Sequence, residues 1–192
     1  MGTAFNYQNY LVRRKVFTFF GAKFHVYNAD KELVLFSKLK AFRLKEDVRL
    51  FTNESMSEEL VNIHARKVLD ISSIYDVSDS QTGLKIGGLK RKGLKSILKD
   101  EWLILDINDQ EIGVIQEDSM GLALIRRFLV NLIPQSYNVY IDGRLVSIFK
   151  QKFNPFILKL NLDFSPDSEG VFDKRLGIAA AIMLSAIDGK QN

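Results

Sequence analysis

A run of cations between positions 81 and 99 is the part of the sequence best suited to bind a ligand. No acidic residue falls between Asp79 and Asp100. Glycines flank positions 90–92, so we expect a basic loop there, followed by a short helix that places two further lysines one turn apart. The run is either a patch that binds anions or a solvated loop balanced by acidic residues elsewhere. The candidate cations for an anionic phospholipid are Lys85, Lys90, Arg91, Lys92, Lys95 and Lys99.

A second basic element is predicted between Ser119 and Ile133. The stretch reads as a helix that is apolar over most of its circumference, and Pro134 ends it. Arg126 and Arg127 give it one narrow polar face. This helix either packs against the rest of the fold or lies in a membrane interface with its arginines at the lipid headgroups. The two arginines therefore join the candidate lipid-binding residues.

The segment from Gly88 to Ser96 nearly matches the phosphate-binding loop of nucleotide hydrolases. In that motif a glycine directly precedes the Lys-Ser pair. Here Leu94 separates Gly93 from Lys95, and no alternation of strands and helices surrounds the segment. We therefore do not expect nucleotide hydrolysis.

Acidic residues suggest two metal sites, and neither is complete. From Asp106 to Glu111 the spacing is that of a calcium loop, but Glu111 stands where such a loop needs glycine for its sharp turn. A hairpin turn is expected instead. A second group precedes the terminal helix, where aspartates commonly serve as turn and cap residues. We expect no metal and no cofactor; the second group is Asp163, Asp167, Glu169 and Asp173.

The sequence offers no set of residues typical of catalysis. His25 and His64 are the only histidines, and each falls in a strand pattern, which favours packing over catalysis. There is no cysteine, and no serine stands at a glycine elbow, so a nucleophilic triad is not expected. The sequence therefore predicts a protein that is not an enzyme.

Length and composition predict one domain over residues 1–192. With 46% hydrophobic and 26% charged residues, the chain has enough apolar surface for one sizeable core. The lack of cysteine excludes a disulfide framework and thiolate metal sites, and it favours a cytoplasmic location. A net charge of +4 indicates a mild preference for acidic partners.

The elements that must position these residues are β-hairpins. Apolar and polar residues alternate on both sides of short turns, of which Asp142-Gly143 is the strongest signal. The pattern returns every 20 to 35 residues or so, about the length of one hairpin unit. We expect a first strand at 10–17 and paired strands at 24–27 with 32–36, 48–51 with 60–63, 74–77 with 84–86, 102–107 with 112–115, and 137–141 with 145–149.

The last stretch predicts a buried helix from about Phe172 to Ile187. Only Ser185 is polar between Leu176 and Ile187, and a helix that is apolar on every face must be enclosed. Asp173 is the expected N-cap. A helix about 10 Å wide needs a barrel of about eleven or more strands around it, which the hairpins supply. The competing fold is a β-sandwich with a helix across one face, but that helix would show a polar stripe.

Several of these segments together resemble bacterial LURP-one-related proteins. They are the stretches 10–17 and 24–27, the segment Lys40-Ala-Phe-Arg-Leu-Lys45, the recurring hairpins and the apolar terminal helix. This family belongs to the tubby C-terminal and phospholipid scramblase superfamily. The resemblance covers nearly the whole chain and implies an α+β, mainly β fold: a twelve-stranded antiparallel barrel around a central C-terminal helix, without catalytic residues.

The resemblance also bears on function. Tubby domains bind phosphoinositides and scramblases act on membranes, but this sequence matches no headgroup motif of either, and it lacks the palmitoylated cysteine-rich segment of scramblases. We expect a non-enzymatic tubby-like barrel protein, cytoplasmic, that binds anionic phospholipid at the membrane periphery. The alternative is a soluble scaffold for protein interaction or a nucleic-acid-binding module. Nucleic acid is disfavoured because no aromatic residue for base stacking lies between Tyr75 and Trp102.

Overall fold

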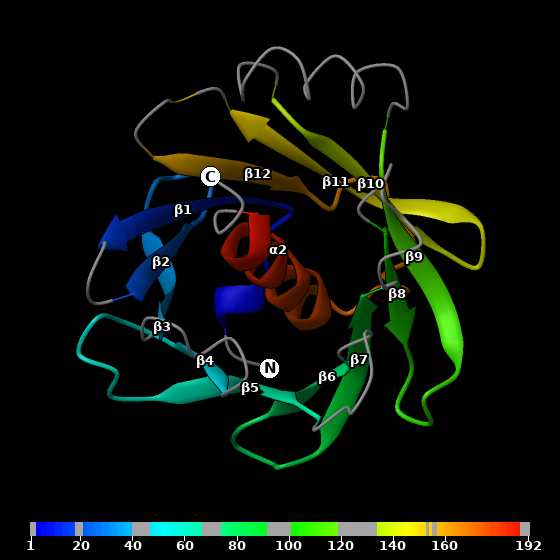
Figure 1. The fold of residues 1–192 in the computed structure, drawn as a ribbon, viewed down its shortest axis with the longest axis horizontal. Coiled ribbons are helices and arrows are strands. Elements are labelled where there is room, and N and C mark those ends of the chain that lie inside the picture. Colours follow the sequence, from blue (N-terminus) through cyan, green and yellow to red (C-terminus); the bar gives the residue numbers. More distant parts are fainter. Residues whose placement is uncertain are drawn as a thin grey trace.

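The computed structural model describes residues 3–17, 21–39, 47–66, 74–91, 101–118, 134–152, 154 and 157–188. In these ranges twelve antiparallel strands close into a barrel, and the C-terminal helix lies inside it (Figure 1). The predicted mainly β barrel with an enclosed helix is confirmed, and the alternative β-sandwich is wrong.

The barrel has the simplest possible connectivity. Each strand pairs with the strands before and after it in the chain, and the first and last strands close the ring. The described elements are η1 (Thr3–Phe5), β1 (Asn9–Phe17), β2 (Gly21–Tyr27), β3 (Leu33–Leu39), β4 (Val48–Phe51), β5 (Glu59–Ala65), β6 (Ile74–Asp79), β7 (Lys85–Arg91), β8 (Glu101–Leu105), β9 (Glu111–Glu117), β10 (Ser136–Ile141), β11 (Arg144–Lys152), β12 (Leu158–Asp163) and α2 (Lys174–Asp188).

The two ends of the barrel differ. Because neighbouring strands run in opposite directions, the turns that follow β2, β4, β6, β8 and β10 all lie at one end. Helix α2 begins at this same end: Arg175, in its first turn, donates to the Asp79 carboxylate at the end of β6 over 2.7 Å. The helix then runs through the interior toward the other end.

The hairpin pattern predicted eleven of these strands but not β12. The sequence of β12 nevertheless alternates as a strand should: Leu160 and Leu162 are buried inside the barrel, while Lys159, Asn161 and Asp163 are partly exposed. β12 pairs with β11 and with β1, at opposite ends of the chain. The hairpin pattern indicates strands in pairs joined by a short turn, and β11 already pairs with β10 in this way. The pattern therefore does not indicate β12, the strand that closes the ring with β1.

The predicted Asp142-Gly143 turn joins β10 to β11. Both residues have positive φ, 48° and 76°, as a two-residue turn of type I′ requires. Glycine adopts this conformation without strain and aspartate tolerates it, so the turn fixes the local register of the hairpin.

Helix α2 is buried as predicted. The Asp173 side chain accepts a hydrogen bond from the backbone N–H of Arg175 at 2.9 Å, which confirms it as the N-cap. From Leu176 to Ala186 the hydrophobic side chains are at most 4% exposed. Gly177 lets the barrel approach closely, because a Cβ there would lie 2.6 Å from the Phe164 ring. A larger side chain at Gly177 would therefore meet the barrel wall.

Candidate anion-binding surface

The basic stretch of the sequence is a strand where the structure describes it, not a loop. Lys85, Lys90 and Arg91 lie on β7. Gly87, on this strand, has a packing role: a Cβ there would lie 2.6 Å from the Leu105 carbonyl oxygen of the neighbouring strand. It permits close packing between the two strands. The remaining cations of the stretch, Lys92, Lys95 and Lys99, lie outside the described residues, as do Arg126 and Arg127.

The two lysines of this strand are neutralised by carboxylates. The Lys85 Nζ lies 2.5 Å from an Asp109 oxygen and 3.2 Å from an Asp76 oxygen. The Lys90 Nζ lies 3.2 Å from a Glu111 oxygen. These contacts match the alternative of a basic stretch balanced by acidic neighbours. Neither lysine is free to offer a full charge to a ligand.

An arginine completes this network. Arg66 donates two hydrogen bonds of 2.6 Å to the Asp76 carboxylate and a third of 2.6 Å to Asp109. The hydrogen bonds from Arg66, and then those from Lys85, lower the pKa of Asp109 to about 2 and also lower the pKa of Asp76. We call Arg66, Asp76, Lys85, Lys90, Asp109 and Glu111 the paired face of the barrel.

The two histidines differ. His25 is packed as predicted: it is 5% exposed, lies against the Phe36 ring with centroids 5.2 Å apart, and places Nε2 3.1 Å from Glu54. The same prediction for His64 is wrong, because its side chain is 63% exposed and meets Asp47. His64 follows the inward-facing Ile63 on β5, so strand alternation turns it outward.

The acidic residues suggested as metal ligands are turn and cap residues. Asp106 accepts hydrogen bonds from the backbone of Asn108 and Gln110, both at 2.8 Å, in the predicted turn between β8 and β9. Asp167 accepts from two backbone N–H groups ahead of α2. Among the residues that the structure describes, no three His, Cys, Asp or Glu side chains gather as a metal site.

A cationic surface lies elsewhere, on the outside of β3, β2, β1, β12 and β11, strands that run from the left side to the top of the barrel in Figure 1. In one row across these strands Lys38 is opposite Lys23, and Lys23 is opposite Lys15. In a second row Arg13 is opposite Lys159, and Lys159 is opposite Lys152. With Lys150, these residues form what we call the cationic face: Arg13, Lys15, Lys23, Lys38, Lys150, Lys152 and Lys159.

Most amines on the cationic face have no partner within the described part of the chain. This holds for Lys38, Lys150, Lys152 and Lys159, and all of these except Lys159 are exposed, whereas the charge of Lys15 acts on the Glu54 carboxylate. The other two cations lie over aromatic rings. Arg13 covers the Tyr27 ring at 5.7 Å, and Lys23 covers the Phe36 ring at 5.9 Å and reaches Glu54 at 3.7 Å. The face therefore presents several unneutralised charges to solvent.

Sequence reasoning missed this surface because its cations come from separate segments. Arg13 and Lys15 lie near one end of the chain, while Lys150, Lys152 and Lys159 lie near the other. Only the closure of the barrel by β1 and β12 brings them together. The available signal is a pair of cations at alternating positions on β1 and on β11, and single cations on β2, β3 and β12. It indicates a surface only when these strands are known to be neighbours.

None of the described helices is long and apolar enough to cross a lipid bilayer. Comparison with known proteins identifies no relative: no protein-family model, no curated protein and no solved structure matches this chain.

Proposed function

We propose that this protein binds peripherally to anionic phospholipid membranes through the cationic face, and that it has no enzymatic activity of its own. The observation that carries the proposal is the cross-strand placement of like charges, with Lys23 between Lys15 and Lys38, and Lys159 between Arg13 and Lys152. Like charges directly opposite one another destabilise a sheet. An anionic partner would relieve that repulsion.

The size of the charge cluster sets the strength of binding. Each lysine or arginine near an anionic bilayer contributes at most about 1 kcal/mol, and salt screens the attraction within about 8 Å at physiological ionic strength. The cationic face therefore supports weak, reversible and salt-sensitive docking. The proposal is therefore of a cytoplasmic protein with transient membrane contact, in keeping with the resemblance to tubby-like and scramblase-like proteins.

The environment of the aromatic rings favours a membrane over a single-stranded nucleic acid. Binding of single strands relies on exposed rings on which bases stack. On the cationic face the Tyr27 ring lies under Arg13, and Phe36 is 1% exposed. These rings already stabilise cations and offer no free stacking surface.

Vesicle binding tests the proposal. Sedimentation with vesicles at about 0.15 M salt should show binding to anionic vesicles, little to neutral ones, and weaker binding to DNA or RNA. The variant Lys38→Gln/Lys152→Gln should bind anionic vesicles more weakly, by up to about thirtyfold, because it loses two charges of up to about 1 kcal/mol each.

The paired face provides a matched control. Lys85→Gln/Lys90→Gln removes the same number of charges, from lysines that already contact carboxylates. It should change vesicle binding by less than about twofold. Equal loss in the two variants, tighter binding to nucleic acid, or equal binding to neutral vesicles would contradict the proposal.

A further inference from the structure

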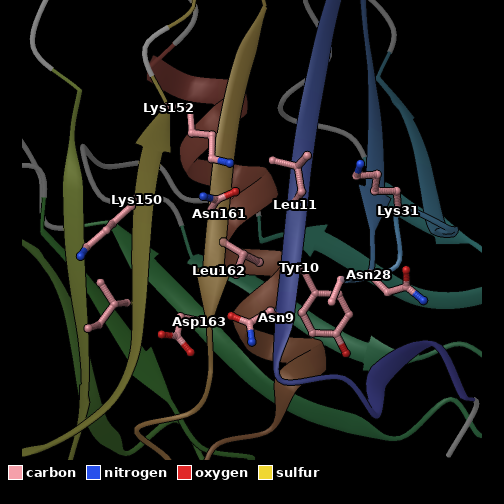
Figure 2. A pocket seen from close by; sticks show the side chains of 12 residues that line it. Asn9, Tyr10, Leu11, Asn28, Lys31, Lys150, Lys152, Asn161, Leu162 and Asp163 are labelled. Carbon is pink, nitrogen blue, oxygen red and sulfur yellow. The ribbon is translucent and has the colours of Figure 1, made fainter.

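A groove crosses the outer surface of β11, β12 and β1 beside the cationic face, and the turn between β2 and β3 forms one of its walls (Figure 2). Its volume is about 430 Å³, enough for a small polar molecule. Asn161 occupies its middle. The side chains around Asn161 differ in charge from one end of the groove to the other.

Hydrogen-bond donors lie around the upper half of the groove as drawn in Figure 2. The Lys152 amine is directed toward the Asn161 side chain, and Lys31 stands on the opposite wall beyond Leu11. No hydrogen bond or ion pair engages the side chains of Lys31, Lys152 or Asn161 within the described ranges. Two ammonium groups and an amide around one space suit a doubly charged phosphate.

An acceptor lies at the lower end of the groove. Figure 2 shows Asp163 and Asn9 together below Asn161, and these two residues are cross-strand partners. One carboxylate oxygen of Asp163 accepts from the backbone N–H of Ser165 at 2.9 Å. The other oxygen has no partner among the described residues. It can accept a hydrogen bond from a ligand.

Strand geometry sets the distance between the donor and acceptor ends. Asn161 and Asp163 point to the same face of β12, two residues apart, which corresponds to about 7 Å. We infer that the groove binds a phosphate ester that carries a protonated amine on a short arm, with its phosphate between Lys31 and Lys152 and its amine at Asp163. The phosphoethanolamine group has this chemistry, either as a free compound or as a lipid headgroup.

This inference goes beyond the proposed membrane docking, since a free compound can occupy the groove without a bilayer. Docking depends on charge summed over the cationic face, whereas the groove requires opposite charges at its two ends. The two ideas share Lys152 but differ in Asp163, which contributes nothing to the attraction of an anionic membrane.

Titration calorimetry with two ligands tests the groove. O-phosphoethanolamine and ethyl phosphate carry the same phosphate, but only the first has an amine. The protein should bind phosphoethanolamine about fivefold more tightly, the effect expected of one partly exposed ion pair. In Asp163→Asn this preference should vanish while ethyl phosphate binding persists, because asparagine keeps the acceptor for Ser165.

Two further variants complete the test. Lys31→Gln/Lys152→Gln should lose affinity for both ligands, and Lys174→Gln, at the start of α2 and away from the groove, should bind both like the parent. Equal affinity of the parent for the two ligands, a preference retained in Asp163→Asn, or no binding of either at millimolar concentration would overturn the inference.

Vesicles distinguish the two sources of the ligand. Added phosphatidylethanolamine, but not phosphatidylcholine, should increase binding to vesicles if the groove takes a lipid headgroup, because a quaternary amine cannot donate to Asp163. If phosphatidylethanolamine does not increase vesicle binding while free phosphoethanolamine still binds, the ligand of the groove is a soluble phosphate ester. If the protein binds anionic vesicles but not phosphoethanolamine, this inference is wrong and the proposed membrane docking still stands.

Discussion

The paired face and the cationic face lie on the same barrel, with three cations on the first and seven on the second, and the neighbours of those cations differ. On the paired face each cation meets a carboxylate from another strand or turn, as Arg66 meets Asp76 and Lys90 meets Glu111. On the cationic face Lys23 is opposite two lysines and Lys159 is opposite a lysine and an arginine. One face stabilises the fold, and the other is available to a partner.

This difference shows why a basic run in a sequence is a poor guide to a binding surface. The charge of Lys85 is neutralised by Asp76, on the partner strand of its own hairpin, and by Asp109, which belongs to the next hairpin. The partner across the strand pair decides whether a cation is neutralised. Substitutions on the two faces should therefore have opposite effects on stability, and only one face should respond to lipid.

The largest effect is expected from a substitution that disrupts the core of the barrel, on which both faces depend. Ala180 is 1% exposed in the middle of α2, and Ala180→Asp would put an unpaired charge into an apolar interior. This should lower the free energy of unfolding by at least about 3 kcal/mol and most of the protein should fail to fold. Thermal unfolding followed by circular dichroism, together with soluble yield, measures it.

The matched control places the same side chain at the partly exposed start of the same helix. Lys174→Asp should keep or slightly raise stability, because a negative charge is favourable near a helix N-terminus. If Ala180→Asp unfolded as cooperatively and at the same temperature as the parent, the helix could not be enclosed by the strands.

A smaller loss is expected on the paired face. Asp76→Ala removes the carboxylate that accepts two hydrogen bonds from Arg66 and leaves that guanidinium without its main partner. The free energy of unfolding should fall by about 1–2 kcal/mol, the range for charge-assisted hydrogen bonds at a partly exposed site. Urea unfolding of Asp76→Ala, Arg66→Ala and the double variant gives their coupling, and additive losses would show that the pair contributes nothing.

Acid should remove the stabilisation that Asp109 gives to the paired face. The pKa of Asp109 is about 2 in the folded protein, lowered by Arg66 and Lys85 from an ordinary value near 3.8. A lowered folded pKa means that this stabilisation is complete above the unfolded value and is lost as pH falls from about 4 toward 2. Asp109→Asn should therefore lose less stability than the parent between pH 5 and 2.5, and parallel curves for the two proteins would refute the assignment.

The smallest effect should have the opposite sign. Lys38→Gln removes one of two like charges that face each other across β2 and β3, and Lys38 has no carboxylate partner in the described structure. Stability should rise by a few tenths of a kcal/mol at low salt, and the gain should disappear at about 1 M salt, where charges are screened within about 3 Å. A clear loss of stability at low salt would mean that Lys38 has a stabilising partner.

The fold could be predicted because its signals are local. Alternating residues on either side of short turns define the hairpins, and the run from Leu176 to Ile187 can only be buried. The Asp173 cap and the Asp142-Gly143 turn are single positions whose chemistry determines the local backbone. β12 was missed because its partners are a strand in the preceding hairpin and the first strand of the barrel.

The candidate site could not be predicted in the same way, because it depends on pairs made across the barrel. Nothing near Arg13 in the sequence indicates that Lys159 lies opposite it. Lys85 appeared unopposed because its carboxylates are on β6 and on the β8–β9 turn. Local charge counts describe a surface only after the strand order is known.

The most direct test of the central claim is to map which lysines a membrane covers. Acetylation rates of individual lysines, measured by mass spectrometry with and without anionic vesicles, report their accessibility. Lys15, Lys38, Lys150 and Lys152 should be protected, whereas Lys85 and Lys90 should react at unchanged rates. Protection confined to the stretch from Lys85 to Lys99, or equal protection on both faces, would contradict the assignment of membrane binding to the cationic face.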